Sequence, residues 1–194
     1  MDTRLVKQQY YQKIDIGWPD ILNNAEVTMQ ARRVADGFEG PWQVPLTDVN
    51  YKFIDFCSNL GVDVYKVIMF YTHRFDNRHI VHIDDPGPGD WARLNWVYGD
   101  NDAEMIWYRL RNGHPMKCIH DSTGDLHYFA DDDAVEEVVR TKIEANPTIV
   151  RTGVLHSAHN YSGKDRFVCQ VWLTKNKVTL TFDELVAVFE SYLI

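Results

Sequence analysis

The sequence predicts a mainly β domain with flanking helices, an antiparallel sandwich or barrel in which a jelly roll is the favoured form. The middle of the chain is a series of short β-branched and aromatic runs separated by turn residues, the pattern of such folds. The aromatic share of 13%, with six Trp and ten Tyr, also favours strands. A chain of 194 residues can bury one core well and is short for two. We therefore expect a single domain over residues 1–194 with its β core at about 62–174.

The N-terminal flank shows little periodicity, and residues 1–46 are expected to be irregular, with strand-like pieces such as residues 25–29. Residues 50–60 carry apolar side chains at helical spacing, and Gly61 is well placed to end this helix. Residues 62–71 then form a β-branched and aromatic run typical of a buried strand. Further strands are expected at residues 79–84, 92–98, 104–110, 116–120 and 126–129.

A second helix is expected at residues 134–145, because Val135, Val138, Val139 and Ile143 recur at helical spacing. The acidic triplet 131–133 before it is interpreted as helix capping and dipole compensation rather than as a metal site. Strands are expected again at residues 148–155 and 167–173. A capping-box pattern at residues 181–184 opens a C-terminal helix at about 182–193.

The charge balance makes some partners improbable. A net charge of −8 and a pI near 5.4 disfavour a broad phosphate-binding surface, so nucleic acid is not the expected partner. The three cysteines are far apart and form no C-x-x-C pair, which suggests neither a disulfide framework nor a thiolate zinc site. No apolar run has the length of a signal core or a membrane span, and we expect a cytoplasmic protein.

A candidate metal site begins with His82 and Asp84. Residues i and i+2 of a strand point to the same face, so this pair can present an imidazole nitrogen and a carboxylate side by side. One more histidine would complete a facial triad of two histidines and one carboxylate, the ligand set suited to iron(II) with open positions. The Pro/Gly-rich segment 85–90 directly after the pair is expected to form a rim or entrance loop.

A second polar cluster stands near the C-terminus, where His156 and His159 lie shortly before Arg166, which opens a strand. Either these residues belong to a hairpin that faces water, or a histidine and the arginine from adjacent strands converge on an anion. The spacing alone leaves both possibilities open.

The order of these residues resembles the 2-oxoglutarate-dependent iron(II) oxygenases over roughly residues 64–173. That family holds a His-x-Asp…His triad in a double-stranded β-helix, also called a jelly roll or cupin-like fold, and a basic residue on the strand after the distal histidine grips 2-oxoglutarate. The resemblance implies metal ligands His82, Asp84 and His156, and a 2-oxoglutarate carboxylate bound by Arg166. His159 is the alternative distal ligand, although its spacing to Arg166 is tighter than the family pattern.

One position departs from the family pattern. Many relatives carry Ser or Thr two residues after the arginine, where it also binds the carboxylate, but this chain has Val168. The second contact is then expected from Asn95, Tyr98 or Tyr108, and we take Asn95 and Tyr108 as candidate co-substrate contacts.

The resemblance implies a dioxygenase that uses O2 and converts 2-oxoglutarate to succinate and carbon dioxide, most often hydroxylating a primary substrate. The sequence does not identify that substrate. Two alternatives remain open: a non-enzymatic jelly-roll binding module, and a cupin-like metalloprotein that does not use 2-oxoglutarate.

Overall fold

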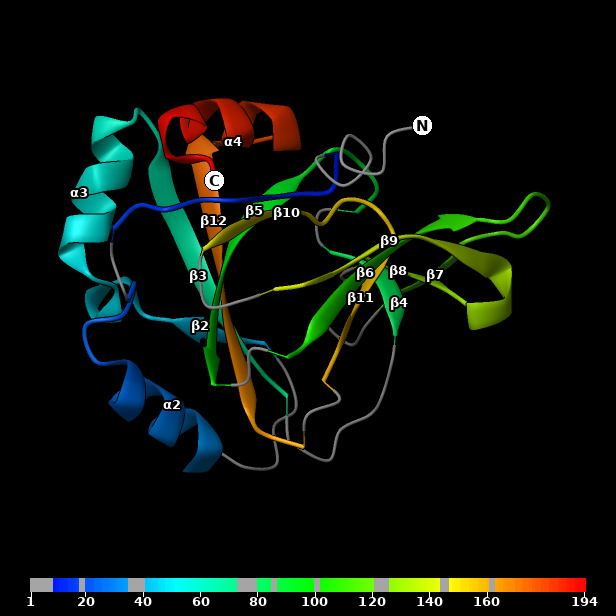
Figure 1. Cartoon of the computed structure of the whole chain (residues 1–194), viewed down its shortest axis with the longest axis horizontal. Helices are drawn as coiled ribbons and strands as arrows, with labels where there is room; N and C mark the ends of the chain where they lie inside the picture. The colour runs from blue at the N-terminus through cyan, green and yellow to red at the C-terminus, as the bar shows by residue number, and fades with distance from the viewer. Residues whose placement is uncertain are drawn as a thin grey trace.

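Two antiparallel sheets face each other in the computed structural model of the chain, and three helices among the described residues flank them (Figure 1). The structure describes residues 9–17, 20–34, 41–72, 80–84, 87–99, 102–120, 126–143, 147–160 and 163–194. The mainly β character predicted from the sequence is confirmed. Among the described residues, no helix has the length and apolar character needed to cross a bilayer.

The first sheet has seven strands. In spatial order they are β1 (Tyr11–Lys13), β10 (Thr148–Arg151), β5 (Ala92–Gly99), β12 (Arg166–Lys175), β3 (Asp63–Thr72) and β2 (Trp42–Val44), with β13 (Val178–Thr179) paired to β12. The second sheet has six, in the order β7 (Lys117–His120), β8 (Leu126–Ala130), β4 (Val81–Ile83), β11 (His156–His159), β6 (Glu104–Leu110) and β9 (Val135–Lys142).

Eight of these strands form nested antiparallel pairs: β3 with β12, β4 with β11, β5 with β10, and β6 with β9. The chain alternates between the sheets from β3 to β6, and again from β9 to β12. As a result, β11 and β12 do not form a hairpin, which was one of the two possibilities that the sequence left open. They lie in opposing sheets and are not hydrogen-bonded neighbours.

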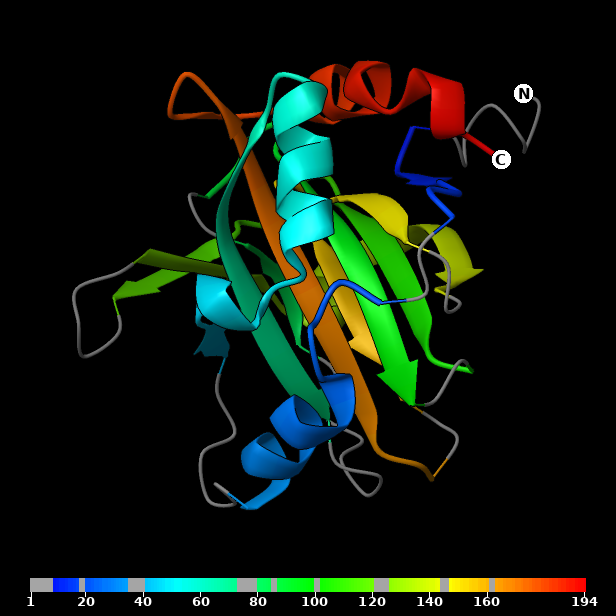
Figure 2. The ribbon, with the colours of Figure 1, turned by 90° about the vertical axis from the view of Figure 1, so that its left-hand side faces the viewer.

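The helices cover the outer face of the first sheet. Helix α3 (Tyr51–Asn59) begins at Asn50, whose side chain accepts a hydrogen bond from the Lys52 amide, and α3 lies across that sheet (Figure 2). Phe53 of α3 is fully buried and meets Trp96 of β5 edge-on at 6.2 Å. Burial of one such aromatic side chain contributes about 1.5–3 kcal/mol. Helix α4 (Phe182–Val188) closes the same cluster and carries the expected capping box at its start.

The first apolar cluster lies between the first sheet and the helices, and a second apolar cluster lies between the two sheets. Strand β12 contributes one face to each cluster. Phe167 packs into the cluster under the helices, whereas Val168 packs into the cluster between the sheets with Trp107 and Met105. This alternation follows from the period of two along a strand. A third cluster covers the outer face of the second sheet around Val81.

The helix predicted at residues 134–145 is wrong, because residues 135–142 form β9 after a short 3-10 turn, η2 (Asp132–Ala134). The pairing register of β9 with β6 shifts between Trp107 and Tyr108, as at a β-bulge. Val135 therefore packs into the third cluster and Val139 into the second, on opposite faces. Because both faces of β9 are buried and a bulge interrupts its alternation, Val135 and Val139 show the four-residue spacing that is typical of a helix.

The N-terminal prediction is also corrected, since residues 25–29 lie in helix α2 (Ala25–Val34) rather than in a strand. The Asn24 side chain accepts a hydrogen bond from the Val27 amide at 3.2 Å, and Glu26 lies in the first turn. These terminal groups stabilise a helix. They outweigh the strand preference of Val27 and Thr28. The remaining short elements are η1 (Leu46–Asp48) and η3 (Glu190–Tyr192).

Candidate metal centre

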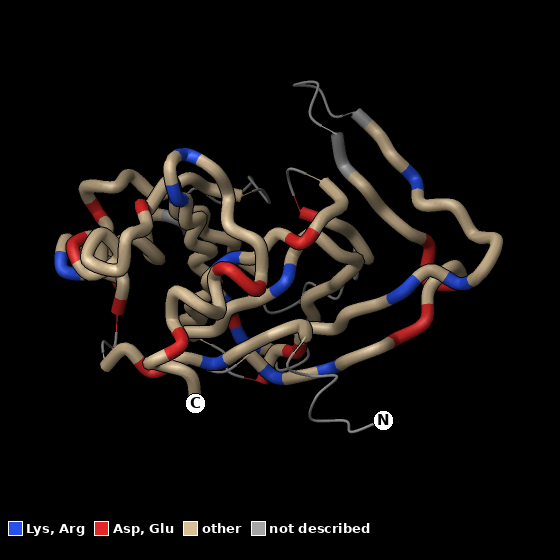
Figure 3. The backbone as a smooth tube through the Cα atoms, turned by 90° about the horizontal axis from the view of Figure 1, so that it is seen from above, with Lys and Arg blue, Asp and Glu red and all other residues tan. Residues whose placement is uncertain are grey.

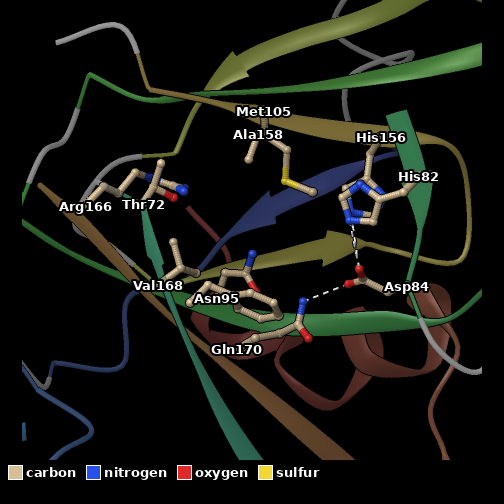
Figure 4. A pocket seen from close by; sticks show the side chains of 11 residues that line it. Thr72, His82, Asp84, Asn95, Met105, His156, Ala158, Arg166, Val168 and Gln170 are labelled. Carbon is tan, nitrogen blue, oxygen red and sulfur yellow. Dashed lines mark hydrogen bonds and ion pairs between the residues drawn. The ribbon is translucent and has the colours of Figure 1, made fainter. Parts of the chain in front are cut away.

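A cavity of about 140 Å³ lies between the two sheets and contains most of the polar residues singled out in the sequence. His82, Asp84 and His156 line one end, and Arg166 and Thr72 line the other (Figure 4). The walls between these ends are formed by Phe70, Asn95, Met105, Ala158, Val168 and Gln170.

Strand geometry brings the three metal-ligand candidates together. His156 of β11 pairs directly with His82 of β4, and directly opposed residues of an antiparallel pair point to the same face. Their ring centroids are 4.6 Å apart. Asp84 follows His82 by two residues and therefore shares its face. Its backbone amide donates to the Thr152 carbonyl at 3.1 Å, which fixes the chain where β4 ends.

Each histidine presents its Nε2 atom to the shared space. His82 Nδ1 lies 2.9 Å from the Ile80 carbonyl oxygen, and His156 Nδ1 lies 2.9 Å from the Val154 carbonyl oxygen. A carbonyl oxygen only accepts, so each Nδ1 carries the hydrogen and each neutral ring keeps its lone pair on Nε2. This is the tautomer in which imidazole binds a metal, held by the backbone contact typical of metal-ligating histidines.

The distances suit one shared ion. Asp84 Oδ1 lies 3.3 Å from His82 Nε2 and 3.7 Å from His156 Nε2, and one ligand atom from each residue lies within 4.8 Å of the others. Ligand atoms about 2.1 Å from an ion and at right angles to each other are about 3 Å apart. The cluster could therefore hold a metal ion after small side-chain adjustments.

The pKa shifts of the three groups favour an anionic aspartate beside at least one neutral ring. Burial raises the pKa of Asp84, but the charges of His156 and His82 and the hydrogen bonds from His82 and Gln170 outweigh it and hold this pKa far below its usual range. Burial, together with the charge of His82, lowers the pKa of His156 to about 4. Burial lowers the pKa of His82 too, but the hydrogen bond and charge of Asp84 raise it above its ordinary value. As the pH falls, His82 is therefore the first of the two rings to take up a proton, and His156 stays neutral to lower pH.

At the other end of the cavity, Arg166 is 4% exposed and lies directly opposite Thr72 of β3 in the pairing register. Cross-strand partners of this kind point to the same face, so the guanidinium and the hydroxyl both line the cavity. Thr72 was missed in the sequence because it belongs to a strand nearly a hundred residues before Arg166. Thr72 therefore supplies a hydroxyl group next to Arg166 in the cavity lining, whereas Val168 of β12 has no hydroxyl group.

Asn95 lies in the cavity wall, as the sequence interpretation of this residue requires, and is 6% exposed. Within the described part of the chain, its Oδ1 atom has no hydrogen-bond partner. A buried amide oxygen without a partner costs free energy, so a bound ligand or water that donates here is favoured.

The two tyrosines considered from the sequence do not line the cavity. The Tyr108 hydroxyl lies 3.0 Å from Ser157 Oγ, which lies 2.6 Å from His159 Nε2. His159 is likewise absent from the cavity lining. The strand period of two places His156 and Ala158 on the face of β11 that lines the cavity and His159 on the opposite face. The Tyr98 hydroxyl bonds to Asp20 instead.

Among the described residues, the acidic triplet 131–133 does not line the cavity. Asp131 bonds to Lys117 at the surface, and η2 takes the place of the helix that the acidic triplet was expected to cap. His79 and residues 85–86 of the expected rim loop lie outside the described residues. The described end of that loop is fixed where the Gly89 amide donates to the Gly153 carbonyl at 2.9 Å.

No family model matches the chain, and no curated protein matches its sequence significantly.

Proposed function

We propose that the protein is a non-haem iron(II), 2-oxoglutarate-dependent dioxygenase that hydroxylates a primary substrate. The observation that carries the proposal is one cavity with a His–Asp–His cluster at one end and a buried arginine at the other. Iron would be held by His82, Asp84 and His156, and the far carboxylate of 2-oxoglutarate by Arg166.

The fold supports this assignment. Four nested antiparallel pairs, with successive strands alternating between two sheets, are the connectivity expected of a double-stranded β-helix, the jelly roll of this oxygenase class. In this arrangement β4 and β11 are neighbours in one sheet, and β12 faces them from the other. That is the geometry in which the three ligands and the arginine can meet one bound molecule.

The donor set is compatible with iron. Two imidazole nitrogens and one carboxylate on one face leave further coordination positions open, which is the ligand set of non-haem iron(II) oxygenases. A structural zinc site, in contrast, is usually closed by four protein ligands.

The far end of the cavity supports a dicarboxylate co-substrate. The planar guanidinium of Arg166 matches a carboxylate with two parallel N–H donors and stays charged at all working pH values. The Thr72 hydroxyl can donate a further hydrogen bond to the same carboxylate. It would then take the role that Ser or Thr has in the family pattern at the position of Val168. Arg166 and Gln170, the residue that bonds to Asp84, are four positions apart on β12, or roughly 13 Å between Cα atoms. An extended dicarboxylate and the arginine side chain can together cover this span.

When bound, the iron and 2-oxoglutarate would supply the oxidative chemistry, in which O2 delivers one atom to succinate and one to the substrate while carbon dioxide leaves. The chain's own groups orient and shield these reactants. His82 and His156 present neutral nitrogens, Asp84 supplies the anionic ligand, and the apolar side chains of Met105 and Val168 limit water in the cavity.

The surface gives only a coarse indication of the primary substrate. Lys and Arg positions are interspersed with Asp and Glu positions along the described backbone (Figure 3). This distribution does not favour an extended nucleic acid, and it leaves a protein side chain or a small metabolite as the substrate classes to test first.

The decisive experiment adds iron(II) and 2-oxoglutarate to the metal-free protein under anaerobic conditions. We expect a visible charge-transfer band that appears only with both components, and succinate formation after air is admitted. Iron binding without 2-oxoglutarate turnover would favour the cupin-like alternative. Absence of iron binding would overturn the proposal and favour a non-enzymatic binding module.

A further inference from the structure

The Gln170 side chain forms two hydrogen bonds to described residues, and one of them reaches the carboxylate of the metal cluster. Its Nε2 donates to Asp84 Oδ2 at 2.8 Å, as the dashed line in Figure 4 marks, and its Oε1 accepts from Trp172 Nε1 at 3.0 Å. Gln170 and Trp172 are both 6% exposed. A continuous buried chain of hydrogen bonds therefore runs from Trp172 to a metal-ligand candidate.

The chemistry of the end groups sets the direction of this chain. An indole N–H can only donate, and an ionised carboxylate can only accept. The Gln170 amide must therefore turn its oxygen to Trp172 and its NH2 group to Asp84. The reverse orientation would place two donors together at one end and two acceptors together at the other.

Trp172 is itself held in place from both neighbouring strands. Its pairing partner on β3, Lys66, has Nζ 3.4 Å from the ring centroid, and Arg93 of β5 has its Cζ atom 3.6 Å from it. Cations at such distances from an indole ring are attracted to it. These contacts hold the indole ring in place, and the direction of its N–H donor is fixed with the ring.

We propose that Gln170, oriented by Trp172, is a positioning residue that makes Asp84 a monodentate ligand through Oδ1. The Gln170 bond occupies Oδ2, while Oδ1 is the atom closest to both histidine Nε2 atoms. A carboxylate bound through both oxygens would occupy one more metal position. Gln170 thus keeps that position available for exogenous ligands. The proposal rests on the metal site of the proposed function, but it does not depend on 2-oxoglutarate.

Metal affinity is the first readout. Loss of a partner that holds a metal ligand typically weakens binding by about 10–100-fold. We expect this loss for Gln170→Met, which keeps the length of the side chain but removes both hydrogen bonds. Trp172→Phe keeps an aromatic ring for the two cations but removes the indole donor along with part of the ring volume. It leaves the Gln170 amide in place, so it should weaken binding less than Gln170→Met but measurably.

The full-length protein would be titrated anaerobically with iron(II), and with cobalt(II) as a spectroscopic probe. The visible bands of cobalt(II) depend on coordination number and geometry, so Gln170→Met should shift them relative to the parent protein. A role limited to packing would lower the melting temperature without moving those bands. Gln43→Met is the matched control, because Gln43 is an exposed strand residue of the same sheet and should leave both readouts unchanged.

The possible failures are distinguishable. If the parent protein binds neither metal, the proposed metal site itself fails. If the parent binds metal and both Gln170→Met and Trp172→Phe match its affinity and its cobalt spectrum, the metal site stands and the role of Gln170 is refuted. Should Gln170→Met not fold, Trp172→Phe alone decides, and parent-like affinity and bands in that variant would refute the role.

Discussion

Replacing Arg166 by alanine tests the end of the cavity farthest from the metal ligands. Arg166 is 4% exposed, so an ion pair with a bound carboxylate would be largely removed from water. Truncating one partner of a buried, hydrogen-bonded charge pair costs about 2–5 kcal/mol, whereas an exposed pair is worth about 0–1 kcal/mol. At about 1.4 kcal/mol per factor of ten, the expected loss of 2-oxoglutarate affinity lies between about thirtyfold and a few thousandfold.

The assay is an anaerobic titration of the iron(II)-loaded protein with 2-oxoglutarate, followed by the charge-transfer band. Iron(II) affinity should change little, because Arg166 is not among the three ligand candidates. Arg166→Lys should lose less than Arg166→Ala, since the charge survives without the bidentate geometry. Arg109→Ala is the control, because the Arg109 side chain is 71% exposed and lies outside the cavity lining. If Arg166→Ala binds 2-oxoglutarate as well as the parent does, the assignment of this arginine is wrong.

Three further measurements test the other parts of the site. His156→Ala should abolish iron(II) binding in a direct titration, while His159→Ala should retain it; the opposite pattern would make His159 the ligand. Thr72→Val should weaken 2-oxoglutarate binding by about tenfold or more, because a hydrogen bond to a charged group is worth about 1.5–3 kcal/mol. Thr72→Ser should restore most of that affinity, and equal affinities in all three proteins would remove Thr72 from the site. Iron(II) affinity should fall as the pH is lowered through the pKa of His82, because protons compete for this ring, whose pKa lies above its ordinary value, whereas His156 stays neutral until about pH 4. Affinity that stays constant from neutral pH down to about 5 would contradict this sign.

The local part of the site could be predicted from the sequence because strand periodicity is local. His82 and Asp84 share a face whenever their segment is extended, and the same rule separates Phe167 from Val168. The spacing of His156 and Arg166 left their convergence open, and only the resemblance to the oxygenases implied it. The spacing did not indicate that they converge from opposing sheets, because an intervening turn can join strands of one sheet or of two.

The parts that could not be predicted depend on pairing register between distant strands. Thr72 meets Arg166 only because β3 and β12 pair with these two residues opposite each other. Gln170 meets Asp84 only because the two sheets stack with β12 facing the end of β4. Neither contact can be predicted from the spacing of residues within one segment.

The wrong helix at residues 134–145 has a related cause. Periodicity distinguishes a helix from a strand only when a strand buries one face, and β9 buries Val135 on one face and Val139 on the other. The β-branched content of the segment was the more reliable signal. In α2, by contrast, the Asn24 cap decided against the strand preference of Val27 and Thr28.

The hydrogen bond between Gln170 and Asp84 also joins β12 of the first sheet to the chain at the end of β4 in the second. Together with the hydrogen bond from Trp107 Nε1 of β6 to the Arg151 carbonyl of β10, it links the two layers across their apolar interface. A molecule that bound the metal at one end and Arg166 at the other would form a further link of the same kind. Amide hydrogen exchange should then slow in β4, β11 and β12 together when both iron and 2-oxoglutarate are bound, and to a smaller extent with iron alone. A ligand in this cavity would therefore raise the free energy needed to separate the two sheets, and the effect would extend to strand residues that do not contact the ligand.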